Sequence, residues 1–209
     1  MNIQTTRRRM NPDDRRAQLL AHGVSVFANL GIGRASHAEV ARAAGVSVAT
    51  VFNYFPSREN LVDQILTHVN DFLSEMVEIV DDPQLPVPEA LYRMMSTFAA
   101  AANSDPDMIR VWLEWSTSIR DETWPKYLVF QESCIDRIRQ VIIRGQVSGT
   151  VSADVDAEDA ARMTVGDAHM VALMQFARRA SSDLDRFLRH TVESVLRVPS
   201  VTGALPGPR

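Results

Sequence analysis

One short stretch near the N-terminus combines residue types that can contact the edges of base pairs. At about 100° per residue, Ala49, Thr50, Asn53 and Tyr54 fall on one face of a helix over residues 48–54 (VATVFNY). This face is mostly small, uncharged and rich in hydrogen-bonding groups, as a helix entering a DNA major groove requires. The asparagine amide can pair with adenine through two hydrogen bonds, and the threonine methyl can pack against a thymine methyl. The pattern predicts a recognition helix.

A second short helix before a tight turn would hold this face in place. Ser36 and Glu39 have capping-box spacing, so we expect Ser36 to begin that helix. Gly45 permits the turn, and Ser47 can cap the recognition helix. The other face of the recognition helix is apolar and is expected to be buried through Val48, Val51, Phe52 and Phe55. The pattern is that of a helix-turn-helix, although an ordinary helical hairpin with a polar exterior has the same pattern.

Length and composition limit the class of protein. A chain of 209 residues is one helical domain or a small module joined to a larger body, and an apolar share of 45% is ample for a core. No apolar run approaches the roughly 20 residues that span a bilayer, and the basic N-terminus lacks the apolar core of a signal peptide. We therefore expect a cytoplasmic protein with no membrane partner. The single cysteine, Cys134, excludes an internal disulfide and is either an inert core thiol, which we expect, or a redox sensor.

The net charge of −4 conceals an uneven distribution. Residues 1–60 hold eight arginines against four acidic residues, a net charge of +4, so the other 149 residues carry −8. A basic DNA-facing module joined to an acidic body would show this asymmetry.

Helix-capping and helix-breaking residues divide the rest of the chain. Asn11 and Pro12 predict the start of the first helix, and residues 81–88 (DDPQLPVP) are the clearest break. The predicted fold is all-α with about nine helices. A basic arm and a three-helix helix-turn-helix module are expected over residues 1–57, and a helical body over 58–209. Within that body, helices are predicted at about 58–80, 89–103, 107–119, 122–146, 157–179 and 182–197.

These segments resemble the TetR family of transcription regulators. The helix ending ARAAGVS, the FNYF end of the recognition helix, and the Arg58 and Leu61 that follow match the family's pattern. The runs GIGRASHAEVA (31–41), VSVATVFNYFPSRENLVDQIL (46–66) and VWLEWSTSIRDETWP (111–125) resemble the LuxR/HapR/SmcR branch of quorum-sensing regulators. Phe52 replaces the tyrosine usual in the wider family, as in that branch. The resemblance implies that the body is a regulatory, ligand-binding and dimerisation domain.

Residue chemistry and the resemblance together predict a set of DNA contacts. Thr50 and Asn53 are expected to contact bases, whereas Ser47 and Tyr54 are expected to contact phosphates. The arginine arm is either a solvated basic tail or a segment that enters an adjacent minor groove. The whole predicted set is Arg7, Arg8, Arg9, Ser36, Ser47, Val48, Ala49, Thr50, Asn53, Tyr54 and Arg58.

Aromatic and methionine side chains gather in the middle of the chain. The cluster consists of Met94, Met95, Phe98, Trp112, Trp115 and Trp124. It is either plain core or the wall of a pocket for a small apolar effector. The resemblance implies the pocket, lined by Leu73, Met76, Phe98, Trp112, Gln131, Ile135 and Ala168. Nearby, Asp167 and His169 are either a pair satisfied by partners at the surface or, if they face inward, groups that recognise a polar part of the effector.

The resemblance also implies a homodimer formed through the last two helices. Its expected interface residues are Ala161, Ala172, Leu184, Phe187, Leu188, Thr191 and Val195. Packing within one chain would explain the same pattern. Two recognition helices about 34–36 Å apart would read a pseudo-palindromic operator in double-stranded DNA.

Catalysis and metal binding have little support. The five histidines form no zinc-binding spacing, and the chain has no glycine-rich phosphate loop, so we expect no enzyme, cofactor or metal. The leading hypothesis is a sequence-specific, quorum-sensing-type global regulator whose activity a small apolar ligand modulates. One alternative is a local repressor of a neighbouring efflux or catabolic operon, induced by its ligand. The other is a helical interaction module without DNA binding.

Overall fold

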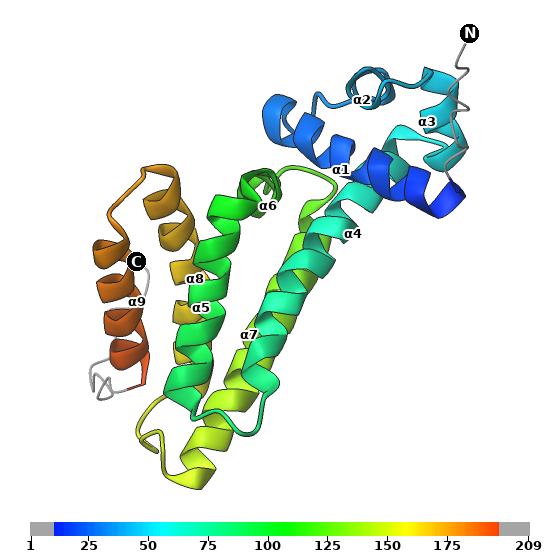
Figure 1. The fold of residues 1–209 in the computed structure, drawn as a ribbon. Helices are drawn as coiled ribbons and strands as arrows, with labels where there is room; N and C mark the ends of the chain where they lie inside the picture. The colour runs from blue at the N-terminus through cyan, green and yellow to red at the C-terminus, as the bar shows by residue number, and fades with distance from the viewer. Residues whose placement is uncertain (1–10, 197–209) are drawn as a thin grey trace, which may run out of the picture.

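The computed structural model describes residues 11–196, and this part of the chain is all-helical, as predicted (Figure 1). The arginine arm lies outside the described residues. The helices are α1 (Pro12–Leu30), α2 (His37–Ala44), α3 (Val48–Tyr54), α4 (Arg58–Val77), the 3-10 helix η1 (Glu78–Asp81), α5 (Val87–Ser104), α6 (Pro106–Thr117), α7 (Trp124–Ser148), α8 (Ala157–Phe176) and α9 (Ser181–Val195). No helix between residues 11 and 196 combines the length and apolar character needed to cross a membrane.

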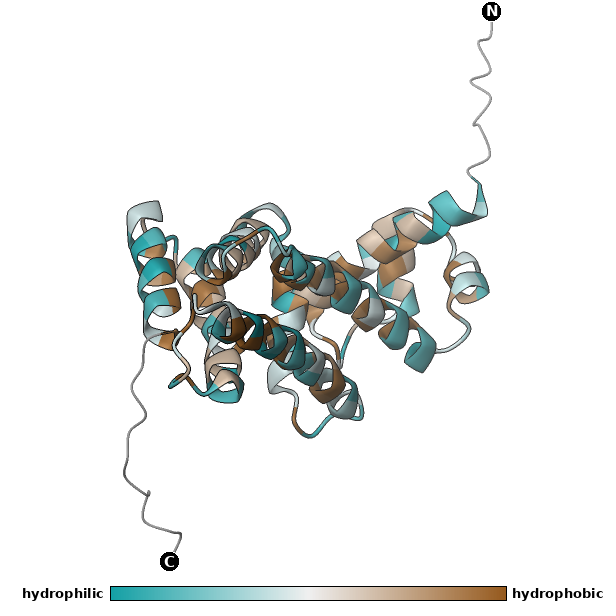
Figure 2. Ribbon diagram, turned by 90° about the horizontal axis from the view of Figure 1, so that it is seen from below, coloured by the Kyte–Doolittle hydropathy of each residue, from teal (hydrophilic) through white to brown (hydrophobic). Residues whose placement is uncertain are grey.

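Three helices form one end of the molecule. In Figure 1, α1, α2 and α3 group together, and α4 leads from them into the body alongside α7. The pair α8 and α9 lies on the opposite side, with α5 between this pair and α4. Figure 2 shows that α9 turns its hydrophobic side toward the other helices and its hydrophilic side outward.

Capping residues begin and end the N-terminal helices where the sequence predicts. Asn11 accepts a hydrogen bond from the Asp14 backbone N–H at 2.8 Å and so begins α1. Gly31 ends α1 with a φ of 86°, a conformation that favours glycine, and a Cβ there would lie only 2.9 Å from Glu114 Oε1. Ser36 accepts from the Glu39 N–H at 3.4 Å, but the Glu39 carboxylate pairs with Arg42, so only half of the capping box forms.

The turn and the recognition helix also form as predicted. Gly45 adopts the left-handed conformation, with φ 65° and ψ 36°, and ends α2. Ser47 then accepts a hydrogen bond from the Thr50 N–H at 3.1 Å and caps α3. Because α3 spans only residues 48–54, its orientation depends on the helices around it.

The predicted burial of one face of α3 is wrong at two of four positions. Val51 and Phe55 are fully buried, but Val48 is 41% exposed and Phe52 is 45% exposed. Most of the helix–helix contacts of α3 are with α2, which covers only a narrow arc of its surface. The outward side of α3 is therefore more apolar than the periodicity indicates.

Two clusters of buried side chains form the core. The first joins α1, α2, α3 and the whole length of α4 to the end of α5, α6 and the start of α7, so the N-terminal helices share a core with the body. The second lies between α5, the rest of α7, α8 and α9. The domain boundary after residue 57 stays a prediction, since Leu61 and Ile65 of α4 are buried in the first cluster.

The expected dimer residues are used mainly for packing within the chain. Ala161, Ala172, Leu188, Thr191 and Val195 are buried within the single chain, and their part in a dimer interface stays a prediction. The two others, Leu184 and Phe187, are partly buried against the second cluster. The outward face of α8 instead exposes Met163, Met170 and Leu173, to 45%, 48% and 54%.

Candidate nucleic-acid interface and ligand pocket

The outward surface of α3 carries one free amide among small and apolar groups. Asn53 is exposed, and its side chain makes no hydrogen bond within the described part of the chain, so its amide is available to a ligand. Thr50 and Ser47 share a hydrogen bond between their side-chain oxygens at 2.8 Å, which leaves the Thr50 methyl as the group free for apolar contact. Ala49 and Val48 are exposed beside them.

Three other predicted DNA contacts also have roles within the chain. Ser36 caps α2, and Tyr54 is partly buried against the first core cluster. Arg58, the first residue of α4, donates from Nη2 to the backbone oxygens of Ile32 and Gly33, both at 2.8 Å. Contact of these residues with DNA stays a prediction.

A buried residue beneath α3, His37, was not predicted to have a role from the sequence. His37 is only 6% exposed, and its ring stacks on Phe52 with centroids 3.9 Å apart and planes at 5°. Its Nε2 lies 2.7 Å from the backbone oxygen of Phe55, which ends α3. The sequence contains no signal for this contact, because it depends on how closely α2 approaches α3.

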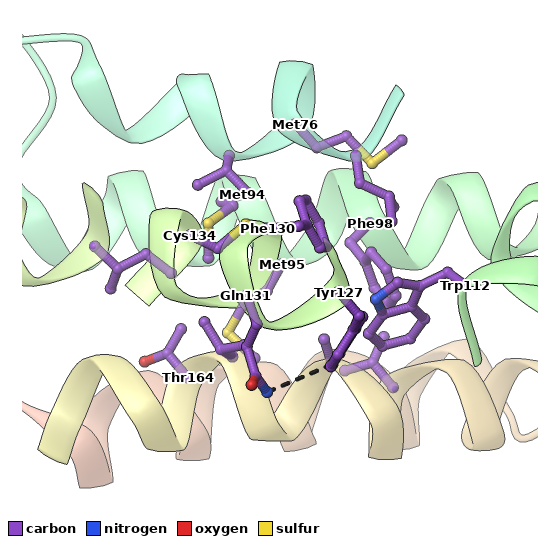
Figure 3. A pocket seen from close by; sticks show the side chains of 16 residues that line it. Met76, Met94, Met95, Phe98, Trp112, Tyr127, Phe130, Gln131, Cys134 and Thr164 are labelled. Atoms are coloured by element: carbon purple, nitrogen blue, oxygen red, sulfur yellow. Dashed lines mark hydrogen bonds between the residues drawn. The ribbon is translucent and has the colours of Figure 1, made fainter. Parts of the chain in front are cut away.

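A cavity lies between α4, α5, α6, α7 and α8 (Figure 3). None of the residues that line it is Asp, Glu, Lys, Arg or His. Its wall is rich in sulfur-containing and aromatic side chains, namely Met76, Met94, Met95, Cys134, Phe98, Trp112, Tyr127 and Phe130. A cavity of this composition suits an uncharged, mainly apolar molecule.

Six of the seven predicted pocket residues line this cavity, namely Leu73, Met76, Phe98, Trp112, Gln131 and Ala168. Ile135 is not among the lining residues and is buried in the second core cluster, so its contact with a ligand stays a prediction. The side chains of α7 that face the cavity are Tyr127, Phe130, Gln131, Cys134 and Ile138, and Ile135 lies one residue beyond Cys134, about 100° around the helix. Lining residues that the sequence analysis did not predict as such include Val77, Thr164, Val165 and Val171.

Two polar side chains on α7 meet at the cavity wall. Gln131 donates from Nε2 to the Tyr127 hydroxyl oxygen at 3.4 Å, as the dashed line in Figure 3 marks. Burial, with a smaller effect from Cys134, raises the pKa of Tyr127 to about 12, so its hydroxyl stays neutral. This pair supplies neutral hydrogen-bonding groups in an otherwise apolar wall.

Asp167 and His169 do not line the cavity. His169 Nε2 lies 2.9 Å from Ser116 Oγ, and its ring centroid is 4.4 Å from that of Trp112, so it links α8 to α6. Burial lowers the pKa of His169 and raises that of Asp167, which a hydrogen bond with Thr191 partly offsets. Both groups are therefore satisfied by partners within the chain, although they are half-buried.

The thiol of Cys134 is expected to resist alkylation in the folded protein. Burial raises its pKa to about 12, so roughly 10⁻⁴ of it is thiolate at pH 8, against about a quarter in an unfolded chain. Iodoacetamide labelling at pH 8, followed by intact mass, should be at least about a hundredfold slower in the native protein than in urea. Rapid native labelling would contradict an inert thiol. Because the folded pKa is raised, the associated stability is complete only below the pKa of the unfolded thiol, about 8.5, and is lost as the pH rises toward 12.

Comparison with known proteins gives consistent matches. Residues 19–65 match the sequence model of the bacterial regulatory proteins, tetR family. The HTH-type transcriptional regulator LuxR of Vibrio harveyi is 33% identical to this chain over 183 residues, which cover 86% of each protein. Among solved structures, a TetR-like transcriptional regulator from Rhodococcus sp. RHA1 matches with a TM-score of 0.74 at 19% identity, over 89% of this chain and 97% of that one. FadR from Bacillus subtilis, in complex with stearoyl-CoA, matches with a TM-score of 0.70 at 20% identity, over 86% and 97%.

Proposed function

This chain belongs to the tetR family of bacterial transcription regulators, and from that premise we propose that it reads a pseudo-palindromic operator as a homodimer under the control of a small apolar ligand. The observation that carries this proposal is the free, exposed amide of Asn53 on a capped recognition helix. Asparagine is well suited to adenine, and the small side chains around it permit close approach to the groove floor. The similarity to LuxR over most of the chain supports a global, quorum-sensing-type role rather than local repression.

The outward face of α8 is the surface on which two copies are proposed to meet. Met163, Met170 and Leu173 recur at helical spacing along it, and each is about half exposed. Between them, Gly166 has no atom within 4 Å of where its Cβ would lie, so another backbone can approach closely there. A two-fold axis through this face would bring the same three side chains of each copy together.

The ligand is proposed to be neutral and largely apolar, with one hydrogen-bonding group. The absence of charged groups among the lining residues disfavours an ion, since its desolvation would have no compensation. Gln131 and Tyr127 would orient the polar group. FadR, which has a similar fold, binds stearoyl-CoA, whose acyl chain is apolar, and this supports the assignment of class.

Two helices of the cavity wall, α4 and α6, also make hydrogen bonds to the segment that connects α1 to α2. Ile32 lies in the connection between α1 and α2, and its N–H donates to Glu114 Oε1 of α6 at 2.9 Å. Its carbonyl accepts from Arg58 of α4 at 2.8 Å. Since α4 and α6 carry Met76 and Trp112 into the cavity, a ligand that shifts either helix would move this connection and, with it, α2 and α3.

The test is binding of the purified protein to its own upstream DNA across a salt series. We expect a dissociation constant below about 1 µM for the palindrome, and binding at least about a thousandfold weaker to a scrambled duplex. The affinity should fall steeply with salt, because arginines displace counterions from the phosphates. Equal, weak binding to both duplexes would reject the proposal and favour an interaction module. Genome-wide mapping would then separate the two regulatory roles, with many dispersed sites for a global regulator and one or two for a local repressor.

A further inference from the structure

We propose that His37 is a positioning residue for sequence recognition, because it fixes how α3 sits against α2. The inference rests on the proposed DNA binding and goes beyond it. His37 is buried where α2 meets α3, so it would act through α3 and not by contacting the DNA itself. Losing it should reduce discrimination between the operator and other DNA more than it reduces binding to DNA in general.

A recognition helix this short has no fixed orientation of its own. Isolated helices below about 12–15 residues are marginal in water, and α3 has seven. Its main helix neighbour is α2, and its fully buried side chains are Val51 and the adjacent Phe55. Few contacts therefore set its tilt and its rotation, and each of them carries a large share of the positioning.

His37 supplies two of these contacts from a single side chain. Its ring lies flat against Phe52 near the middle of α3, at 3.9 Å between centroids. Its Nε2 is 2.7 Å from the Phe55 carbonyl oxygen at the end of α3, and that nitrogen must carry the proton because a carbonyl only accepts. Two contacts three residues apart resist both rotation of α3 about its axis and tilting of its end.

This constraint acts directly next to the base-reading amide. Phe52 precedes Asn53 in the chain, so a rotation of α3 that breaks the ring stack also turns the amide. Hydrogen bonds to a base edge tolerate only a few tenths of an ångström. Contacts to phosphates depend mainly on charge and are less sensitive to such a rotation. Phe52 has no hydroxyl with which to hydrogen-bond a phosphate. The ring contact that the structure shows for it is the stack on His37.

The experiment measures dissociation constants for the operator and for a scrambled duplex of equal length. The variants are His37→Ala, His37→Phe, which keeps a ring to stack on Phe52, and the control His190→Ala on the exposed side of α9. Binding is measured at a temperature at which circular dichroism shows each variant folded. The expected loss for His37→Ala is roughly 10- to 100-fold in the ratio of the two constants, with the scrambled-duplex constant and the salt slope unchanged. His37→Phe should lose less of this preference for the operator than His37→Ala does. His190→Ala should show the same preference as the unaltered protein.

Two results would overturn the inference. One is an unchanged ratio in folded His37→Ala. The other is an equal loss of affinity for both duplexes, which would mean that His37 only stabilises the fold. If the unaltered protein itself shows no preference for its operator, the proposed function fails, and the inference fails with it. That outcome is recognisable before any variant is compared.

Discussion

Asn53→Ala is expected to lower the affinity for the operator by between roughly 30-fold and 10⁴-fold. A bidentate amide–adenine pair contributes about 1–3 kcal/mol of discrimination, and a dimer has two half-sites, so about 2–6 kcal/mol is lost. Affinity for unrelated DNA should change by less than about twofold, because phosphate contacts and net charge are untouched. Fluorescence anisotropy with operator and scrambled duplexes at one salt concentration would measure both values.

This substitution isolates recognition from folding. The Asn53 side chain is exposed and makes no hydrogen bond within residues 11–196, so alanine removes no hydrogen bond of the fold, and alanine is the better helix former. Asn103→Ala, at an exposed position near the end of α5, is the matched control and should leave operator binding intact. Full operator affinity in Asn53→Ala would mean that other side chains of α3 read the bases.

Leu173→Glu is expected to convert the protein to a monomer and to weaken operator binding by roughly a hundredfold or more. The side chain is 54% exposed on the face of α8 that we propose for dimerisation. A two-fold axis would place two unpaired glutamates in one apolar contact, where neither has a cation to compensate its desolvation. A monomer then holds only one half-site and loses the gain from linking two.

Sedimentation equilibrium at micromolar concentrations would measure the assembly, and circular dichroism would check the fold. Ile119→Glu is the control, since Ile119 is also an exposed apolar residue but lies in the connection between α6 and α7. It should remain dimeric. If Leu173→Glu is still a dimer of unchanged affinity, the two copies meet elsewhere.

Much of the fold follows from local rules that the sequence displays. Asn11, Ser36 and Ser47 begin helices, and Gly31 and Gly45 end them, because each satisfies backbone groups or a backbone angle within a few residues. The predicted helix ends therefore lie within three residues of the observed ones. The ends of α4 and α8 differ most, by three residues each, and at α4 the 3-10 helix η1 continues the helical pattern to residue 81 in a tighter form.

The errors concern which neighbour covers a given face. Periodicity shows that Val48 and Phe52 share a side of α3 with Val51, but it does not show how wide an arc α2 covers. Likewise, the apolar side of α9 predicts burial without saying whether the partner is the same chain or a second copy. The position of Ile135 depends on the same kind of detail, since a rotation of α7 by one residue decides which of its side chains face the cavity. Such questions depend on tertiary packing and are not encoded locally.

The sulfur-rich wall of the cavity has a consequence for signal selectivity. Met76, Met94 and Met95 are unbranched and change rotamer at little cost, so the wall can reshape around different outlines. Members of a homologous series that differ by a methylene would then be interchangeable or competing signals. The one rigid requirement would be a neutral group placed to meet Gln131 and Tyr127. Such a regulator would report the abundance of a chemical class and not the presence of one compound.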